Sequence, residues 1–216
     1  MNKIEKEKLL SKTILIIITI LYNCNTIFSQ QEADVLIPIG IGALSFVAAN
    51  AENKELAKEI SQFRSKEFIV NYIIGPAESK EIKFEIESLA SDNSAGLISL
   101  AFNCMEVNKK GLLLAFFGDN RNEYGVMSRA YAFRYIPLQE ARELLNRIDE
   151  IKEKNKEYLT SNWDVNNVYI EYEDIKFVIY NGVGGIIIRT LWNGFEVEWE
   201  KVAFDRTKRR LNKWFL

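Results

Sequence analysis

The chain of 216 residues contains no histidine. Histidine is the side chain best suited to proton transfer near neutral pH, because its unperturbed pKa is about 6.5. Its absence excludes Ser-His-Asp and Cys-His catalysis and zinc sites with histidine ligands. An enzyme built from this sequence would have to use carboxylates, lysine, tyrosine or a Ser–Lys pair.

Cysteine is almost as scarce, with Cys24 and Cys104 as its two occurrences. If an N-terminal signal containing Cys24 is removed, Cys104 remains alone, which excludes an internal disulfide and C-x-x-C redox chemistry. We expect Cys104 to be a buried thiol that packs as a small hydrophobic side chain. Intermolecular pairing or a reactive thiol is the alternative.

Proline occurs three times, and no Pro/Gly/Ser-rich linker divides the chain. With 48% hydrophobic and 27% charged residues, the composition is typical of a globular protein with a core of its own. The formal net charge of −2 gives no reason to expect nucleic acid as a partner. We therefore predict one folded domain, without a metal and without a cofactor.

The first 29 residues have the pattern of a secretory signal peptide. A lysine-rich segment (1–12) precedes a short apolar segment (13–22), and Ser29 provides a small residue before Gln30. The apolar segment is too short to span about 30 Å of hydrocarbon comfortably as a helix. We predict cleavage after residue 29, with the mature domain at 30–216 and a periplasmic or extracellular location.

Two alternatives to a cleaved signal stay open. The segment could remain as an uncleaved anchor, or Cys24 could be acylated to give a membrane-anchored lipoprotein. The bulky Tyr22 and the polar Asn23 before this cysteine fit a lipoprotein signal poorly, although Leu21 fits it.

A second apolar run follows at 34–50 (DVLIPIGIGALSFVAAN). Proline and glycine in its first half weaken a helix there. Beyond Gly42 an approximate helical stripe of apolar residues continues to Phe63. We predict an extended lead-in followed by a mostly buried helix; membrane contact, or an apolar surface for an oligomer or ligand, is the alternative.

Strand-like segments dominate from residue 68 onward. Residues 82–88 alternate between apolar and charged side chains, as in a strand with one face in solvent. The continuous apolar runs at 96–102 and 112–117 predict central strands that are covered on both faces. The first group of predicted strands comprises 68–74 (FIVNYII), 82–88 (IKFEIES), 96–102 (GLISLAF), 112–117 (LLLAFF) and 125–136 (GVMSRAYAFRYI).

The period changes to that of a helix at about 138–158. Apolar residues recur there at three- and four-residue spacing, from Leu138 to Ile151, and Pro137 is tolerated at the first turn. Strand-like segments then return, with Asn193-Gly194 as a strong signal for a hairpin turn. A shorter helix is expected at each end of the mature chain. The sequence thus predicts an α+β fold, a largely antiparallel sheet with a long amphipathic helix packed on it. Strands followed by a helix occur twice in loose form.

The helix-forming segment 135–149 (YIPLQEARELLNRID) lies between two β-rich segments. This layout, together with the Ser-Gln-Gln junction at 29–31, resembles small uncharacterised exported proteins of Gram-negative bacteria. The resemblance implies an exported α+β domain but no particular activity.

Several patterns suggest chemistry that their context does not support. Ser91-Asp92-Asn93 matches one element of penicillin-interacting serine enzymes, but the chain has no S-x-x-K and no K-T-G. The glycine-rich segment 181–185 lies between strands and is interpreted as a hairpin loop rather than a phosphate-binding loop. The segment 119–123 offers oxygen ligands, yet Arg121 lies in its middle, so a turn is favoured over a calcium site.

Glutamates 196, 198 and 200 alternate along one predicted strand, with Glu171 and Glu173 on a possible neighbour. Such a row is usually the solvated face of a sheet. Paired carboxylates are nevertheless the one acid/base route that this chain supplies well, provided that one of them is desolvated. An envelope hydrolase or glycan-active enzyme is therefore the enzymatic alternative.

The C-terminal segment carries the predicted binding surface. It concentrates five cations against the single Asp205, and apolar residues interleave with them. Such a segment could bind an acidic partner or anionic lipid; a terminal helix that docks its apolar side on the sheet is the structural alternative. The candidate site residues are Arg206, Lys208, Arg209, Arg210, Lys213 and Trp214. We predict a non-enzymatic exported module that binds a protein or an envelope component, with membrane contact not favoured and the oligomeric state open.

Overall fold

The computed structural model describes residues 36–39, 46–77, 81–92, 96–162 and 165–216, with side chains from residue 53 onward. All of them belong to one compact unit, Asp34–Leu216. The predicted signal segment and Cys24 lie outside the described residues. No helix in the described ranges is both long enough and apolar enough to cross a bilayer.

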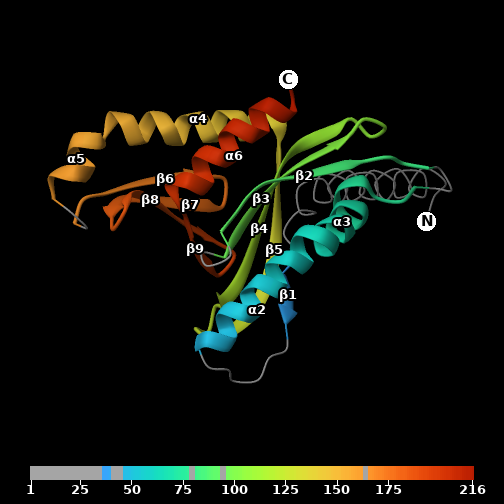
Figure 1. Cartoon of the computed structure of the whole chain (residues 1–216), viewed down its shortest axis with the longest axis horizontal. Coiled ribbons are helices and arrows are strands. Elements are labelled where there is room, and N and C mark those ends of the chain that lie inside the picture. The colour runs from blue at the N-terminus through green and yellow to red at the C-terminus, as the bar shows by residue number, and fades with distance from the viewer. Residues whose placement is uncertain (1–35, 40–45, 78–80, 93–95, 163–164) are drawn as a thin grey trace, which may run out of the picture. The chain divides into compact units, whose positions relative to one another are not determined.

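The order of elements confirms the α+β class (Figure 1). An N-terminal strand and a long helical segment come first, followed by two groups of strands that each end in helix. The elements are β1 (Leu36–Ile39), α2 (Phe46–Glu59), η1 (Ile60–Arg64), α3 (Ser65–Phe68), η2 (Ile69–Ile74), β2 (Glu85–Asp92), β3 (Leu97–Cys104), β4 (Lys109–Arg121), β5 (Met127–Pro137), α4 (Leu138–Lys154), α5 (Lys156–Ser161), β6 (Asn167–Tyr172), β7 (Ile175–Gly182), β8 (Gly185–Trp192), β9 (Phe195–Trp199) and α6 (Lys201–Trp214).

The strands form two antiparallel meanders, β2–β5 and β6–β9, each followed by helix. The repetition expected from the sequence is therefore present as strand–strand–strand–strand–helix, twice. β1 extends the first meander by pairing with β5, and β4 joins the second meander through one bridge between Asn120 and Phe195.

The central strands of the first meander are buried on both faces, as their continuous apolar runs predict. On β4, Leu112, Leu114 and Phe116 join the core that includes α4, α6 and the inner face of the second meander. Leu113 and Ala115 point to the opposite face, where the N-terminal helical segment packs. There the rings of Phe68 and Phe133 are stacked with their centroids 4.9 Å apart.

The prediction of a strand at 68–74 is wrong, because this segment is helical and belongs to α3 and η2. Its β-branched residues favour a strand locally, but Phe68, Ile69 and Ile73 bury their side chains from one continuous helical segment that starts at Phe46. Packing of an apolar face outweighs the weak intrinsic preference for a strand.

The second apolar run of the sequence, residues 34–50, contains the strand β1 and the start of the helix α2, as expected. The helical stripe predicted beyond it is correct at Ile60, which is fully buried. It is wrong at Phe63, whose side chain is 65% exposed. Residues 40–45, with the glycines of the run, lie outside the described ranges.

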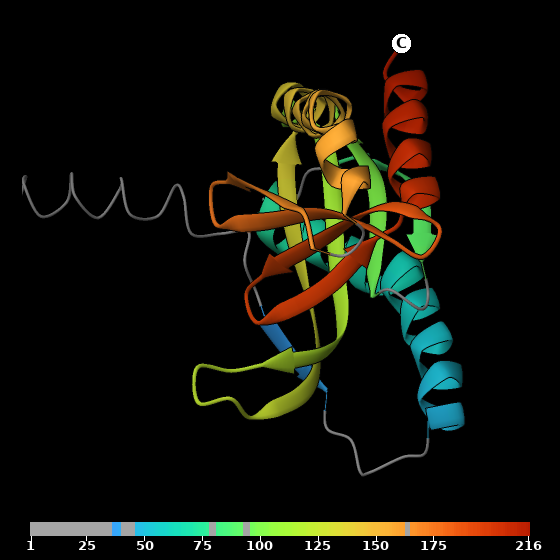
Figure 2. The same ribbon diagram turned by 90° about the vertical axis from the view of Figure 1, so that its left-hand side faces the viewer.

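The second meander has one buried and one solvent-facing side. Phe195, Val197 and Trp199 of β9 are buried, whereas Glu196 is exposed and Glu198 is half-buried. This alternation confirms the pattern read from the sequence. Figure 2 shows the β4–β5 hairpin extending beyond this meander.

The turn between β8 and β9 is the predicted Asn-Gly hairpin turn. Both residues have positive φ, 46° at Asn193 and 79° at Gly194. The turn also lies against β4, because Arg121 N–H donates to Gly194 O at 2.9 Å and Asn120 Nδ2 donates to Asn193 O at 2.7 Å. A β-carbon on Gly194 would lie 2.4 Å from the backbone oxygen of Arg121, so this position requires glycine.

The long amphipathic helix predicted at 138–158 is present in two pieces, α4 and α5, which are separated at Asn155. Asn155 has φ −104° and ψ 13°, outside the helical region. The predicted apolar stripe of α4 is buried, from Leu138 to Ile148. α4 and α6 pack side by side and run antiparallel, since Arg142 contacts Asn212 whereas Lys152 approaches Asp205.

Candidate functional site

The C-terminal helix α6 begins after Glu200 and docks on the sheet through one face. Phe204, Thr207 and Leu211 are buried at three- and four-residue spacing, which is the apolar stripe of an amphipathic helix. The structural alternative stated for the C-terminal segment is therefore correct for this face. The charged residues of the segment lie beside it or opposite to it.

The buried face is tied to β3 by two hydroxyl groups. Thr207 Oγ1 donates to Ala203 O at 2.8 Å, within the helix. Ser99 Oγ lies 2.6 Å from Thr207 Oγ1 and 3.3 Å from Ala90 O. Either hydroxyl can be the donor in the contact between Ser99 and Thr207, and this contact joins β3 to the helix.

Three of the six predicted binding residues are used inside the molecule. Lys208 binds the carboxylate of Asp149 on α4. Arg210 Nη1 donates to two backbone oxygens of β2, Ser88 O at 3.3 Å and Leu89 O at 3.1 Å, where the register with β3 shifts. Trp214 is half-buried and packs against the core. These three residues hold α6 in place.

The other three predicted residues, Arg206, Arg209 and Lys213, are exposed. Their spacing of three and four residues places them on one face of α6. None of them forms a hydrogen bond or an ion pair with another residue in the described ranges. We call these three residues the basic stripe.

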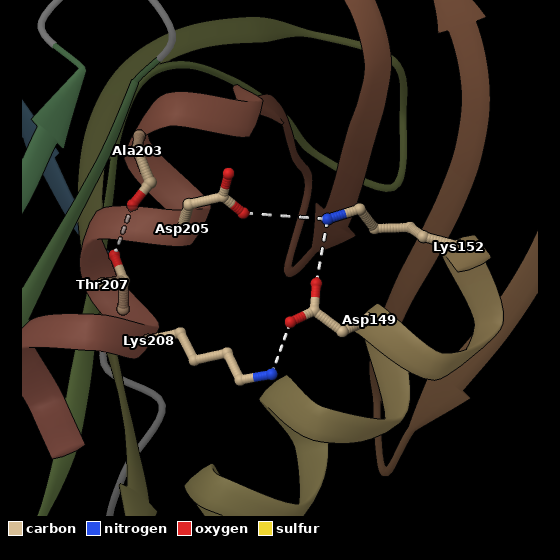
Figure 3. Close-up of polar contacts among 6 residues, drawn as sticks. All are labelled: Asp149, Lys152, Ala203, Asp205, Thr207 and Lys208. Carbon is tan, nitrogen blue, oxygen red and sulfur yellow. Dashed lines mark hydrogen bonds and ion pairs between the residues drawn. The ribbon is translucent and has the colours of Figure 1, made fainter.

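Between α4 and α6 lies a group of four charges that the sequence analysis did not assign as a site (Figure 3). Lys152 Nζ donates to Asp149 Oδ1 at 2.9 Å and lies 3.9 Å from Asp205 Oδ1. Asp149 also accepts a hydrogen bond from Lys208. We call Asp149, Lys152, Asp205 and Lys208 the α4–α6 cluster.

Lys152 is the unusual member of this cluster, because its side chain is 8% exposed. Its ammonium group lies 4.6 Å from the centroid of the Phe204 ring, a distance typical of a cation–π contact. The burial of Lys152 could have been predicted from the sequence. Lys152 follows Ile148 by four residues and so continues the apolar stripe of α4. A lysine at a core position of an amphipathic helix predicts a buried partner.

Burial raises the pKa of the Asp149 carboxyl, and the hydrogen bonds from Lys208 and Lys152 lower it; the lysines prevail, so its pKa lies below the ordinary value of 3.8. The carboxylate is therefore charged at neutral pH and joins two cations. This arrangement holds two helices together.

A hollow of about 630 Å³ adjoins the cluster. Its walls come from the ends of α4 and β7, from α5, and from the starts of β8 and α6, and they carry charges of both signs. The lining residues are Asp149, Glu150, Lys152, Glu153, Lys156, Thr160, Asn181, Gly184, Gly185, Ile186, Lys201 and Asp205. The volume of the hollow is large enough for a small polar molecule. The charges of Asp149 and Lys152, however, are already neutralised by each other.

A second groove, of about 540 Å³, adjoins the Asn193-Gly194 turn. Asp119, Asp174 and Glu196 lie in its wall, and all three are exposed. Asp174 accepts a hydrogen bond from Trp192 Nε1 at 2.8 Å and pairs with Arg134 at 3.2 Å. The groove thus lacks a desolvated carboxylate in the part of the chain that the structure describes.

The glutamate row on β9 is organised by Arg189 of β8. Arg189 lies 2.8 Å from a carboxylate oxygen of Glu196 and 2.8 Å from one of Glu198. The side chains of these glutamates are 59% and 38% exposed. The two glutamates are thus ion-paired and at least partly solvated, so neither is the desolvated carboxylate that paired-carboxylate chemistry requires.

The prediction of a turn at 119–123 is wrong for its first three residues, because Asp119, Asn120 and Arg121 belong to strand β4 and pair with β5. Among the described residues, no group of three or more Asp, Glu, Cys or His side chains is placed to hold a metal ion. Cys104 is buried at 1% exposure, as predicted, and its Sγ lies 3.3 Å from Lys83 O.

With this geometry established, the chain was compared with known proteins. No family model matches it, and no curated protein and no solved structure was found that matches it.

Proposed function

We propose that the chain is an exported, non-enzymatic binding module that contacts an acidic surface of a partner protein through the basic stripe on α6. The proposal rests on a difference between the cations of this helix: some have a partner within the described part of the chain and others do not. Lys208 and Arg210 bind groups of the same chain, whereas Arg206, Arg209 and Lys213 lie exposed on one face without a described partner.

The dimensions of the stripe favour a narrow acidic partner. Arg206 and Lys213 are seven residues apart, which corresponds to roughly 10 Å along a helix. A row of carboxylates on a helix or strand of the partner matches that length. Rim charges of this kind accelerate association and select the partner more than they add affinity.

A protein partner is favoured over a lipid surface for two reasons. The apolar face of α6 is buried on the sheet, so the helix has no apolar side left to insert into a bilayer. In addition, Glu85 and Glu87 are exposed on β2, the strand on which α6 packs. An anionic membrane that contacted β2 as well as α6 would be repelled by these carboxylates.

The proposal of export rests on residues 1–29, with their lysine-rich, apolar and small-residue segments. The resemblance to small exported proteins of Gram-negative bacteria supports the same location. Mass spectrometry of the protein recovered from cells tests it: we expect an unmodified N-terminus at Gln30. An acylated Cys24 would establish the lipoprotein alternative instead.

The binding proposal is tested with poly-L-glutamate as an acidic polypeptide. A variant with Arg206→Gln, Arg209→Gln and Lys213→Gln is compared with a control that carries Lys54→Gln, Lys58→Gln and Lys66→Gln. The control lysines are exposed on the N-terminal helical segment, so both variants lose three positive charges. Fluorescence anisotropy at several salt concentrations gives the affinity of each.

We expect the stripe variant to bind roughly tenfold more weakly, because each exposed ion pair contributes about 0.5 kcal/mol. The control should bind like the unmodified protein. Equal weakening in both variants would show that only net charge matters and would refute a site on α6. Tighter binding to phosphatidylglycerol vesicles than to poly-L-glutamate would refute a protein partner.

A further inference from the structure

The described strands form three outer edges, at β1, β2 and β6, and β9 is joined to β4 by a single bridge at Phe195. An unpaired edge offers a row of backbone donors and acceptors to any other strand, so most proteins protect their edges. Proline, lysine, a bulge or a covering element serves this purpose. The three edges of this chain differ in that respect.

Two of the edges carry such protection. β1 contains Pro38, which has no backbone N–H to donate. β2 has an irregularity in its register between Ser88 and Ala90, and α6 packs on it. Arg210 of that helix occupies the backbone oxygens of Ser88 and Leu89.

The third edge, β6, has no proline, no lysine and no bulge, and its one charged side chain is Glu171. Its sequence is NVYIEY, and it pairs with β7 in a continuous register from Asn167 to Tyr172. No other strand in the described part of the chain pairs with it. Valine, isoleucine and tyrosine are residues that favour pairing in a sheet.

Exposed apolar side chains flank this edge. Tyr158, Val165 and Tyr169 are 51%, 63% and 55% exposed. The end of α5 and the start of β6 are joined, because Asn166 Nδ2 donates to Tyr158 O at 2.6 Å. Tyr158 and Val165 thus lie near the start of the strand that carries Tyr169.

We propose that two copies of the chain associate through this edge, with β6 pairing antiparallel to β6 of the second copy about a two-fold axis. The two second meanders then form one continuous sheet across the dimer. A two-fold arrangement uses the same surface on both copies, so the strand has to be complementary to itself.

The sequence of β6 meets that condition when Tyr169 lies opposite Tyr169 of the second copy. Glu171 then faces Asn167 of the second copy, so no like charges oppose each other. Val168 lies opposite Ile170 of the second copy on the inner face, and the two tyrosines meet on the outer face. Because β6 can pair with itself in this antiparallel register, the proposed partner is a second copy of the chain.

Sedimentation equilibrium of the mature chain tests the proposal. The pairing involves five residues of each strand, 167–171, and buries less than a standard interface, so we expect a dimer at roughly 10–100 μM protein. The variant Tyr169→Lys places two ammonium groups opposite each other and should weaken the dimer by roughly tenfold or more. Tyr124→Lys is the matched control, since Tyr124 is 82% exposed on the β4–β5 hairpin; it should leave the dimer unchanged.

Hydrogen exchange of the unmodified protein provides an independent measurement. Amides of 167–172 should become more protected as the protein concentration rises, whereas those of β1 should not change. A monomer throughout the concentration range would overturn the proposal. A dimer that tolerates Tyr169→Lys, or whose exchange at 167–172 is independent of concentration, would overturn it as well.

Discussion

Asp149 and Lys152 form an ion pair across one turn of α4, with 2.9 Å between Asp149 Oδ1 and Lys152 Nζ. The lysine is almost completely buried, and the same carboxylate also binds Lys208 of α6. One acidic side chain therefore neutralises a buried cation and joins two helices. This dual role makes Asp149 the residue of the α4–α6 cluster whose loss is the most costly.

We predict that Asp149→Asn lowers the free energy of unfolding by about 2 kcal/mol at pH 7. Removal of one partner leaves the buried ammonium of Lys152 with Asp205 alone, 3.9 Å away. Lys208→Met is the comparison; it keeps the pair of Asp149 and Lys152 and should cost less than about 1 kcal/mol. Urea unfolding followed by circular dichroism gives both values.

The effect of Asp149→Asn should depend on pH in a defined direction. The folded state lowers the pKa of the Asp149 carboxyl below 3.8, so its stabilisation is complete well above that value. It is lost as the pH falls through the lower pKa of the folded state. The difference in unfolding free energy between the two proteins should be constant from pH 7 to about pH 5 and shrink below about pH 4. A difference that grows on acidification would contradict this role.

Thr190 and Thr207 should respond in opposite ways to the same substitution. Both are fully buried, but Thr190 Oγ1 has no hydrogen-bond partner among the described residues, whereas Thr207 Oγ1 bonds to Ala203 O and Ser99. Thr190→Val removes an unsatisfied hydroxyl at nearly constant volume and should stabilise the protein by about 1 kcal/mol. Thr207→Val should destabilise it by a similar amount. Thermal unfolding of both variants is the measurement, and a shift of the same sign in both would be inconsistent with this assignment.

Alanine substitutions at Gly194 and Gly125 separate the energetic cost of a steric clash from that of an unfavourable backbone conformation. Their φ angles are almost equal, 79° and 78°. A β-carbon would meet Arg121 O at 2.4 Å on Gly194 but nothing within 4 Å on Gly125. We expect Gly125→Ala to cost about 1 kcal/mol through its backbone alone and Gly194→Ala about 3 kcal/mol. Chemical unfolding measures the gap; equal costs would show that the turn relaxes away from β4.

Local patterns in the sequence were sufficient to predict most of the fold. The alternation in β9, the Asn-Gly turn and the apolar stripe of α4 each depend on residues that are close in sequence, and each is correct in the structure. The segment 68–74 failed because its local preference is for a strand, while its burial depends on distant Phe133. Local propensity carries no information about that contact.

The candidate site was predictable only in part, for the same physical reason. The excess of cations at 206–213 is visible in the sequence, but their roles depend on partners far along the chain. Lys208 meets a carboxylate 59 residues away, and Arg210 meets backbone oxygens more than 120 residues away. Composition identifies the charged helix, whereas the fold decides which cations find a partner within the chain.

Arg209 and Arg210 are neighbours in sequence, and their substitution should separate binding from stability. Arg210→Ala leaves the oxygens of Ser88 and Leu89 without their charged donor and should destabilise the protein by about 1 kcal/mol. Arg209→Ala removes the same charge from an exposed side chain without a described partner, so its unfolding free energy should stay within about 0.5 kcal/mol of the unmodified protein. Binding to poly-L-glutamate should show the reverse order, because Arg209 belongs to the basic stripe while Arg210 faces β2. If Arg210→Ala weakened binding more than Arg209→Ala at a pH and temperature where both are folded, the partner would have to contact the β2 side of α6.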